Sequence, residues 1–189
     1  VKVGVRRIVL AIGYKEHLMK DFVREMTSKY QIEIFCSVEK EPLNTGGPIK
    51  LAESLLSSKE HGDFFVLNSD VIGEFPFLEM LAFHRSHKAM STILTFEVED
   101  TSRYGVISID QKTNRVLDFM EKPLFATSKL INAGIYIFSN EVFKTIELRS
   151  FSLEKELFPR LCENGQIYSF PLLGFWKDLG IPKDFIEGT

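Results

Sequence analysis

The sequence predicts an α/β fold built on a doubly wound, mostly parallel sheet. From residue 7 to residue 98, short apolar runs alternate with stretches of helical apolar spacing, in the order strand, helix, strand, loop, helix, strand, helix, strand. The runs are continuously apolar, which is typical of strands buried on both faces. A crossover helix between two strands of one sheet makes them parallel, and this gives the doubly wound arrangement.

The elements of the first half follow from simple patterns. An apolar run over 7–12, ended by Gly13, predicts a strand, and the apolar spacing over 15–29 predicts a helix. Residues 39–48 have the composition of a loop, and Pro48 suits the first turn of a helix. Another helix is expected over 75–87, and further strands are expected over 32–38, 64–67 and 91–98.

The second half is less regular. Residues 104–110 and 115–121 flank Lys112-Thr113-Asn114, which predicts a hairpin. The remaining expected elements are strands over 131–138, 166–170 and 175–176 and helices over 141–146, over 152–162 and from Pro182. We find no repeat and no domain linker, so a single domain over 1–189 is expected, one able to bury about 70% of the surface that its unfolded chain exposes.

Composition excludes several classes of protein. The net charge is -3, and Lys and Arg are spread along the chain, which argues against a nucleic-acid binder. No apolar run approaches the ~20 residues that cross a bilayer, so no membrane partner is expected. Cys36 and Cys162 lie far apart in apolar surroundings without a CxxC motif, which favours buried free thiols and a cytoplasmic location.

Short polar side chains directly follow the predicted strand over 64–67. Ligands of open α/β sheets bind beyond the carboxyl ends of the strands, so Asp70 of Asn68-Ser69-Asp70 is placed to hold a ligand or a metal. Asp178 follows an aromatic pair, and together the two carboxylates would make an oxygen-rich site for Mg²⁺. Taken alone, Asn68-Ser69-Asp70 is equally compatible with an ordinary turn.

Other candidates are a loop, a charged pair and an asparagine. Thr45, Gly46 and Gly47 could bring backbone N–H groups close to a base or a phosphate, although the spacing is also that of an ordinary turn. In Glu121-Lys122-Pro123 the lysine could hold a phosphate and the glutamate could accept from sugar hydroxyls, unless the two form an exposed surface pair. Asn132, in an apolar strand, requires hydrogen-bond partners.

Two histidines, His84 and His87, are separated by three positions on the helix predicted over 75–87. A zinc site takes three or four ligands, and no third ligand of the right type is nearby in the sequence. We therefore expect the helix surface there rather than a metal site.

Taken together, these segments resemble the sugar-1-phosphate nucleotidyltransferases, and within them the GDP-mannose pyrophosphorylase (mannose-1-phosphate guanylyltransferase) branch. The resemblance covers nearly the whole chain. Its segments are Glu41-Pro42-Leu43, Thr45 with Gly47-Pro48, Phe65 to Val71, Ser102 to Val106, Glu121-Lys122-Pro123, Ile131 to Gly134, Ser152 to Glu156, Gly174 to Gly180 and Pro182 to Phe185.

The resemblance implies a role for each matched position. Asp70 and Asp178 would hold Mg²⁺ on the triphosphate, and Lys122 would bind the sugar phosphate. The sugar-side residues would be Gly105, Glu121, Asn132 and Gly134, and the nucleotide-side residues would be Pro42, Asn44, Thr45, Gly46, Gly47 and Asn68. The implied reaction forms GDP-mannose and pyrophosphate from GTP and mannose 1-phosphate, by a full-length form that is a homo- or hetero-oligomer.

The chain also departs from the family pattern. It contains neither the glycine-rich G-x-G-T-R-x-x-P loop nor the carboxy-terminal β-helix of hexapeptide repeats, so we expect a fragment that is truncated at its N-terminus, lacks its first central strand and has little activity alone. A regulatory or binding subunit, and a pyrophosphorylase that uses UTP or dTTP with glucose 1-phosphate, are the alternatives. Asn44 replaces the usual glycine, and we expect it to adopt the left-handed region.

Overall fold

The computed structural model describes residues 3–13, 16–57 and 62–180. The chain divides into two compact units. The first unit comprises Val1–Gly62 and Phe143–Leu153, and the second unit comprises Asp63–Val142 and Glu154–Thr189.

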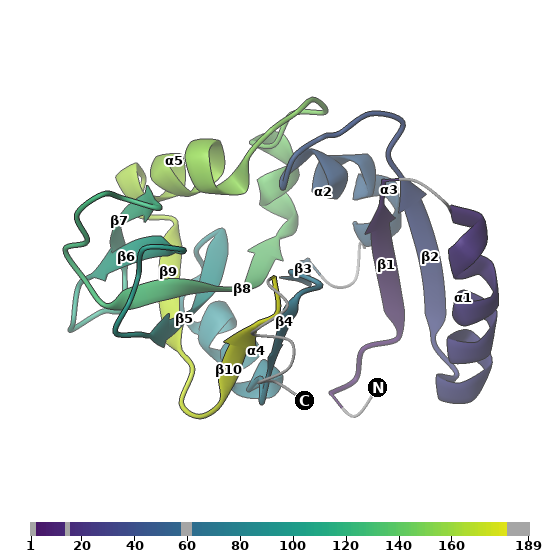
Figure 1. Cartoon of the computed structure of the whole chain (residues 1–189), viewed down its shortest axis with the longest axis horizontal. Helices are drawn as coiled ribbons and strands as arrows, with labels where there is room; N and C mark the ends of the chain where they lie inside the picture. The colour runs from purple at the N-terminus through teal and green to yellow at the C-terminus, as the bar shows by residue number, and fades with distance from the viewer. Residues whose placement is uncertain (1–2, 14–15, 58–61, 181–189) are drawn as a thin grey trace. The chain divides into compact units, whose positions relative to one another are not determined.

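The first unit opens with a strand–helix–strand arrangement. Strand β1 (Arg7–Ile12) pairs in parallel with β2 (Glu33–Val38), and α1 (Glu16–Tyr30) connects them (Figure 1). Two short helices follow, α2 (Gly47–Leu51) and α3 (Glu53–Leu56), and the predicted Pro48 lies in the first turn of α2. Among the described residues β1 pairs with β2 alone, so its other edge has no partner strand there. These elements confirm the pattern-based prediction for residues 7–56.

The second unit contains a six-stranded sheet of β3 (Asp63–Leu67), β5 (Ser91–Glu97), β6 (Gly105–Ile109), β7 (Val116–Glu121), β8 (Leu130–Ser139) and β9 (Ile167–Pro171). Helix α4 (Phe77–His87) crosses from β3 to β5, and these strands run in the same direction, as the crossover rule requires. However, β8 pairs antiparallel with β3, β5 and β6. The α/β class is therefore confirmed, but this sheet is mixed rather than mostly parallel, because β8 returns between two strands that are parallel to each other.

Strand β8 is covered on both faces, which explains its continuous apolar run. Its odd-numbered residues pack with Met80 of α4, Leu94 of β5 and Trp176 in one core cluster. Its even-numbered residues Tyr136 and Phe138 lie against Phe158 at the start of α5 (Phe158–Glu163). Figure 1 shows α4 and α5 on opposite sides of this sheet. This two-sided packing fixes which residues of β8 face which layer.

A separate two-stranded ladder was only partly expected. Strand β4 (Val71–Gly73) pairs antiparallel with β10 (Trp176–Asp178). The sequence predicts a strand near 175–176 but not β4, because a run of three residues gives too little periodicity. The indole Nε1 of Trp176 donates to the carbonyl oxygen of Ala133 at 3.0 Å, which ties β10 to β8.

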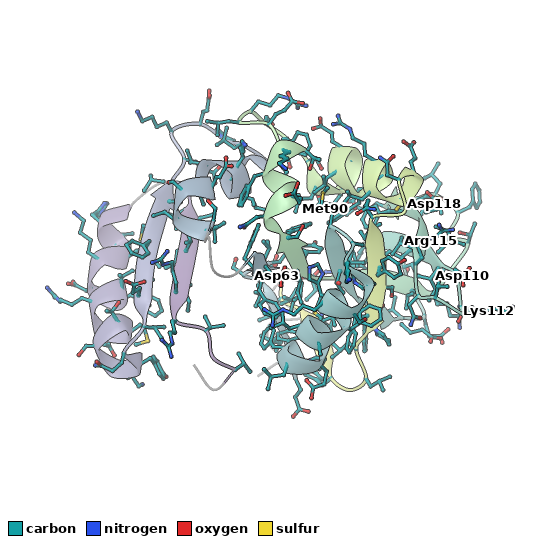
Figure 2. The ribbon with its side chains drawn as sticks, turned by 180° about the vertical axis from the view of Figure 1, so that it is seen from behind. Asp63, Met90, Asp110, Lys112, Arg115 and Asp118 are labelled. Atoms are coloured by element: carbon teal, nitrogen blue, oxygen red, sulfur yellow. The ribbon has the colours of Figure 1, made fainter. Side chains whose placement is uncertain are left out.

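Other expectations are refined by the structure. The predicted hairpin is confirmed as β6 and β7, with Asp110, Lys112 and Arg115 at its turn (Figure 2). Residues 140–144 form a 3₁₀ helix, and the helix expected over 152–162 is a π-helical turn (Leu153–Leu157) followed by α5. The helix expected from Pro182 lies outside the described residues. None of the described helices has the length and apolar character required to cross a bilayer.

The placement on the helix surface is wrong for His84, and it holds only in part for His87, which is half-buried. His84 is buried, and both His84 and His87 hydrogen-bond to the hydroxyl of Thr92. The reason is that the last turn of α4 packs against β5, which carries Thr92, and β9, so the face that bears these residues is an inner face. Both cysteines are free, and they are partly rather than fully buried.

Candidate active site

The β4–β10 ladder positions the two aspartates. Asp178 is the last residue of β10 and pairs with Val71, while Asp70 immediately precedes β4. Beyond the ladder, the N–H of Leu179 donates to the carbonyl oxygen of Asp70 at 2.7 Å. The N–H of Gly180 donates to Oδ1 of Asp178, also at 2.7 Å. The backbone on either side of each carboxylate is therefore fixed by hydrogen bonds.

The structure brings the two carboxylates together at Gly180. A Cβ atom on Gly180 would lie 2.9 Å from Oδ1 of Asp178 and 3.9 Å from Oδ2 of Asp70. Both side chains thus approach the same point, and a glycine leaves that point open. The sequence separation of these aspartates gave no information about this proximity.

This arrangement fits the ligand set of Mg²⁺. A protein usually holds Mg²⁺ with one or two carboxylates, and substrate phosphates and waters complete the octahedron. Within the described ranges, no three acidic, histidine or cysteine side chains gather into a metal-binding group. Asp70 and Asp178 would therefore supply two oxygen ligands and leave the other positions to a polyphosphate and water.

Glu121 and Gly105 face each other across the β6–β7 hairpin. They are register partners, and a Cβ on Gly105 would lie 3.0 Å from Oε2 of Glu121 and 2.6 Å from Cζ of Phe119. The carboxylate thus lies directly over the Gly105 backbone, and any side chain at position 105 would displace it. Burial, and secondarily the carboxylate of Glu154, raise the pKa of Glu121, while Lys122 opposes this change.

Lys122 differs from its neighbour in exposure. Its ammonium Nζ lies 3.7 Å from Oε1 of Glu121, and its side chain is 61% exposed against 22% for Glu121. Its backbone has a φ of 47°, in the left-handed region that non-glycine residues rarely adopt. The exposed fractions show that the alternative of an exposed surface pair describes the side chain of Lys122 but not that of Glu121. The ammonium remains accessible to an anionic ligand.

Asn132 has the partners that a polar side chain in an apolar strand requires. Its Oδ1 accepts from the N–H of Gly134 at 2.9 Å, and its Nδ2 donates to the hydroxyl of Tyr136 at 2.9 Å. The β5–β8 register shifts here: Ile93 pairs with Tyr136, but Thr95 pairs with Asn132. Strand β8 thus contains a bulge at the residues predicted to contact the sugar, as is common beside active sites.

Gly134 and Asn68 stabilise this bulge together. Gly134 has a φ of 77°, and a Cβ there would lie 3.0 Å from Nδ2 of Asn68. The N–H of Asn68 donates to the carbonyl oxygen of Gly134 at 2.8 Å. Gly134 is therefore required by conformation and by close contact, and Asn68 packs on the bulge two residues before Asp70.

The loop assigned to the nucleotide belongs to the first unit. Asn44 has a φ of 62°, which confirms its expected left-handed conformation. The N–H of Thr45 donates to Oδ1 of Asn44 at 2.9 Å, and the N–H of Gly46 donates to the carbonyl oxygen of Phe151 at 2.8 Å. The N–H groups of Thr45 and Gly46 thus have hydrogen-bond partners within the first unit, and their approach to a base or phosphate stays a prediction.

Packing explains both glycines of the loop. A Cβ on Gly46 would lie 2.7 Å from the ring of Phe151, and one on Gly47 would meet the carbonyl oxygen of Arg149. Pro42, Asn44 and Thr45 remain exposed, whereas Gly46 and Gly47 are buried. Contact with a base therefore stays a prediction for the exposed residues Pro42, Asn44 and Thr45.

The sequence analysis assigned no role to Tyr136 or to Glu154, although Glu154 lies in the matched segment Ser152 to Glu156. Tyr136 is 0% exposed, and its phenol feels the charges of Glu154, Glu121 and Asp70, carboxylates from both sides of the candidate site. Glu154 lies on the π-helical turn, a conformation that often marks functional sites. The available signal was a tyrosine within an otherwise apolar strand, since a buried phenol requires a hydrogen-bond partner.

The fold is that of a nucleotide-transferring enzyme family. A family model described as nucleotidyl transferase matches residues 1–189, so the chain belongs to the nucleotidyl transferase family. Within the family, it is 49% identical over 190 residues to a mannose-1-phosphate guanyltransferase of Hypocrea jecorina, covering 100% of this chain and 52% of that protein. It is 47% identical over 188 residues to the mannose-1-phosphate guanylyltransferase catalytic subunit beta of Danio rerio, covering 100% and 52%.

A solved structure is also similar. The crystal structure of HddC from Yersinia pseudotuberculosis matches with a TM-score of 0.76 and 29% identity, covering 98% of this chain and 78% of that chain. The same protein has been solved in complex with GMP-PN, and matches with a TM-score of 0.75. The chain spans about half the length of the curated relatives it matches.

Proposed function

We propose that the complete protein transfers a guanylyl group from GTP to mannose 1-phosphate and releases GDP-mannose and pyrophosphate. The observation that carries this proposal is the convergence of Asp70 and Asp178 at Gly180. Membership of the nucleotidyl transferase family supports the class of reaction. The names of the similar guanylyltransferases support the choice of guanine and mannose.

The reaction is a substitution at phosphorus. A phosphate oxygen of mannose 1-phosphate attacks the α-phosphorus of GTP, a new P–O bond forms, and the bond to the bridging oxygen of the β-phosphate breaks. Pyrophosphate leaves with that oxygen and its electron pair. Such a transfer requires positioning and charge neutralisation rather than a covalent nucleophile.

Different side chains of the second unit would provide the positioning and the charge neutralisation. The exposed ammonium of Lys122 would bind the phosphate of the sugar phosphate as a point charge. Glu121 and the carboxamide of Asn132 would hold the sugar hydroxyls, with the open backbone of Gly105 beside them. Mg²⁺ held by Asp70 and Asp178 would neutralise the triphosphate and align the α-phosphorus.

The retained carboxylates and lysine favour an enzyme over a regulatory subunit of the same family. A regulatory role requires only the pocket, whereas Asp70 and Asp178 serve the chemistry. The free thiols of Cys36 and Cys162 support a reducing, cytoplasmic setting.

The test is release of pyrophosphate by the complete protein with each of GTP, UTP and dTTP, in combination with either mannose 1-phosphate or glucose 1-phosphate. We expect Asp70→Asn and Asp178→Asn each to reduce turnover by about 100-fold or more, since each removes one charged metal ligand. The matched control is Asp118→Asn, an exposed aspartate of β7 (Figure 2), which should retain wild-type turnover. Preference for UTP with glucose 1-phosphate, or full activity of either aspartate variant, would contradict the proposal.

A further inference from the structure

The hydroxyl of Tyr136 is enclosed in the protein and has one specific neighbour. Tyr136 lies on β8 with 0% exposure, and its ring packs against Phe138 and Phe158 at centroid distances of 5.9 and 5.2 Å. Its oxygen accepts a hydrogen bond from Nδ2 of Asn132, four residues earlier on the same strand and face, at 2.9 Å. A buried tyrosine thus reaches one of the residues assigned to the sugar.

The two hydrogen bonds of Asn132 determine the orientation of its carboxamide. The N–H of Gly134 can only donate, so the atom that it meets at 2.9 Å must be the oxygen. The amide nitrogen then points to Tyr136 and donates to its hydroxyl oxygen. If that oxygen were removed, the carboxamide would keep the hydrogen bond through its own oxygen and lose the one that holds its nitrogen.

Burial, more than charge, favours the neutral phenol, whose oxygen still carries a lone pair that accepts a hydrogen bond. Burial raises the pKa of Tyr136, and the carboxylates of Glu154, Glu121 and Asp70 act in the same direction. The hydroxyl therefore stays neutral at physiological pH, and a lone pair of its oxygen remains available to Asn132.

We infer that Tyr136 is a positioning residue of the sugar side of the site: its hydroxyl holds the Asn132 carboxamide in one orientation, and Asn132 in turn holds the Gly134 bulge on which Asn68 packs. This inference rests on the proposed function and deepens it. Tyr136 itself would not contact the sugar. It would determine how well the carboxamide of Asn132 is oriented toward the sugar hydroxyls. The sugar hydroxyls are not among the reacting atoms, so a contact to them should act alike in the ground state and the transition state, and we expect the effect on KM.

The experiment is a steady-state comparison of Tyr136→Phe with the wild type, both as the complete protein. A phenylalanine keeps the ring contacts and removes only the oxygen. We expect the KM for mannose 1-phosphate to rise about 10- to 100-fold, the range for one unpaired buried donor, with kcat and the KM for GTP within about 3-fold of wild type. The matched control is Tyr168→Phe on β9, whose ring stacks on His87 at 4.2 Å and which should behave as wild type.

A double-mutant cycle separates positioning from a general structural effect. If Tyr136 acts through Asn132, Tyr136→Phe should have no further effect on KM in an Asn132→Ala background. An equal rise in KM in both backgrounds would overturn the inference, as would a fall in kcat with an unchanged KM.

A measurement without turnover keeps the inference separate from the proposed function. In NMR spectra of the wild type, the side-chain amide of Asn132 and the backbone amide of Gly134 should exchange at least about 10-fold more slowly than unprotected amides, because both protons are hydrogen-bonded. Fast exchange of both would refute the inference even if Tyr136→Phe failed to fold. Absence of pyrophosphate release by the wild type would refute the proposed function while leaving this result to decide the role of Tyr136.

Discussion

Acidification from pH 7 to pH 4 should destabilise the second unit through His84 and His87. Nδ1 of His84 and Nε2 of His87 each lie 2.8 Å from the hydroxyl oxygen of Thr92, and the N–H of Ala89 donates to Nδ1 of His87 at 3.0 Å. The contact with Ala89 fixes the tautomer of His87, because a backbone N–H can only donate: Nδ1 of His87 accepts, and its Nε2 donates to the hydroxyl of Thr92. A further proton on His87 would have to occupy Nδ1, which is already used as an acceptor.

Burial makes this neutral state persist. Burial, reinforced by the charge of Arg85 and opposed by Asp63, lowers the pKa of His84. Nε2 of His84 lies 3.7 Å from Oδ1 of Asp63, a residue marked in Figure 2. Burial, and then the neighbouring His84, lower the pKa of His87 from 6.5 to about 4.

The direction of the pH effect follows from proton binding. Between pH 6.5 and about 4 the unfolded chain binds a proton at His87 and the folded chain does not, so stability rises with pH in this window. The stabilisation is complete above pH 6.5 and is lost on acidification toward pH 4. A pKa difference of one corresponds to about 1.4 kcal/mol, which sets an upper bound of about 3 kcal/mol for His87. Since the ring is only partly buried, we expect about 2 kcal/mol.

The assay is urea unfolding at pH 7, 5.5 and 4.5, with the free energy of unfolding extrapolated to water. His87→Gln has no proton to gain, so its free energy of unfolding should fall about 1–2 kcal/mol less than that of the wild type over this range. His17→Gln, at an exposed histidine of α1, is the matched control and should follow the wild type. Equal pH dependence in the wild type and His87→Gln would refute the reasoning.

Three further predictions concern packing and a thiol. Gly47→Ala should lower the free energy of unfolding by about 1–3 kcal/mol in urea titrations, because its Cβ would clash with the carbonyl oxygen of Arg149. Gly134→Ala should cost about 1–3 kcal/mol in the same assay, since it combines a φ of 77° with close contact to Asn68, and an unchanged midpoint would contradict this. Burial raises the pKa of Cys162 to about 12, so at pH 8 iodoacetamide should modify it at least about 100-fold more slowly in the native protein than in urea, as followed by mass spectrometry.

The sequence patterns predicted most elements but not the direction of β8. Helix α4 makes β3 and β5 parallel, and the apolar periodicity of that segment carries this information. Nothing in the apolar run over 131–138 says which strands flank it, because a strand buried on both faces has the same composition in either direction. The mixed sheet is thus a consequence of long-range pairing that local spacing does not encode.

The candidate site was predictable to the extent that it lies in short motifs. Asp70, Glu121, Lys122 and Asp178 each follow or end a strand, which is where ligand-binding side chains are expected. The proximity of Asp70 and Asp178 depends on the β4–β10 ladder, and three-residue strands leave no periodic signal. The hydrogen bonding of the loop was not predictable for a related reason, since the acceptor for the N–H of Gly46 is the carbonyl oxygen of Phe151, far away in the sequence.

Three parts of the site in the second unit share one feature: a polar side chain packs closely against a glycine. A Cβ would lie 3.0 Å from the carboxylate of Glu121 at Gly105, 3.0 Å from the amide of Asn68 at Gly134 and 2.9 Å from the carboxylate of Asp178 at Gly180. Each of these polar side chains thus lies in or beside the space that a side chain at the glycine position would fill. An alanine at any one of them would move a polar group rather than remove it. Substitution of any of these three glycines should therefore disrupt the site although every functional group is still present.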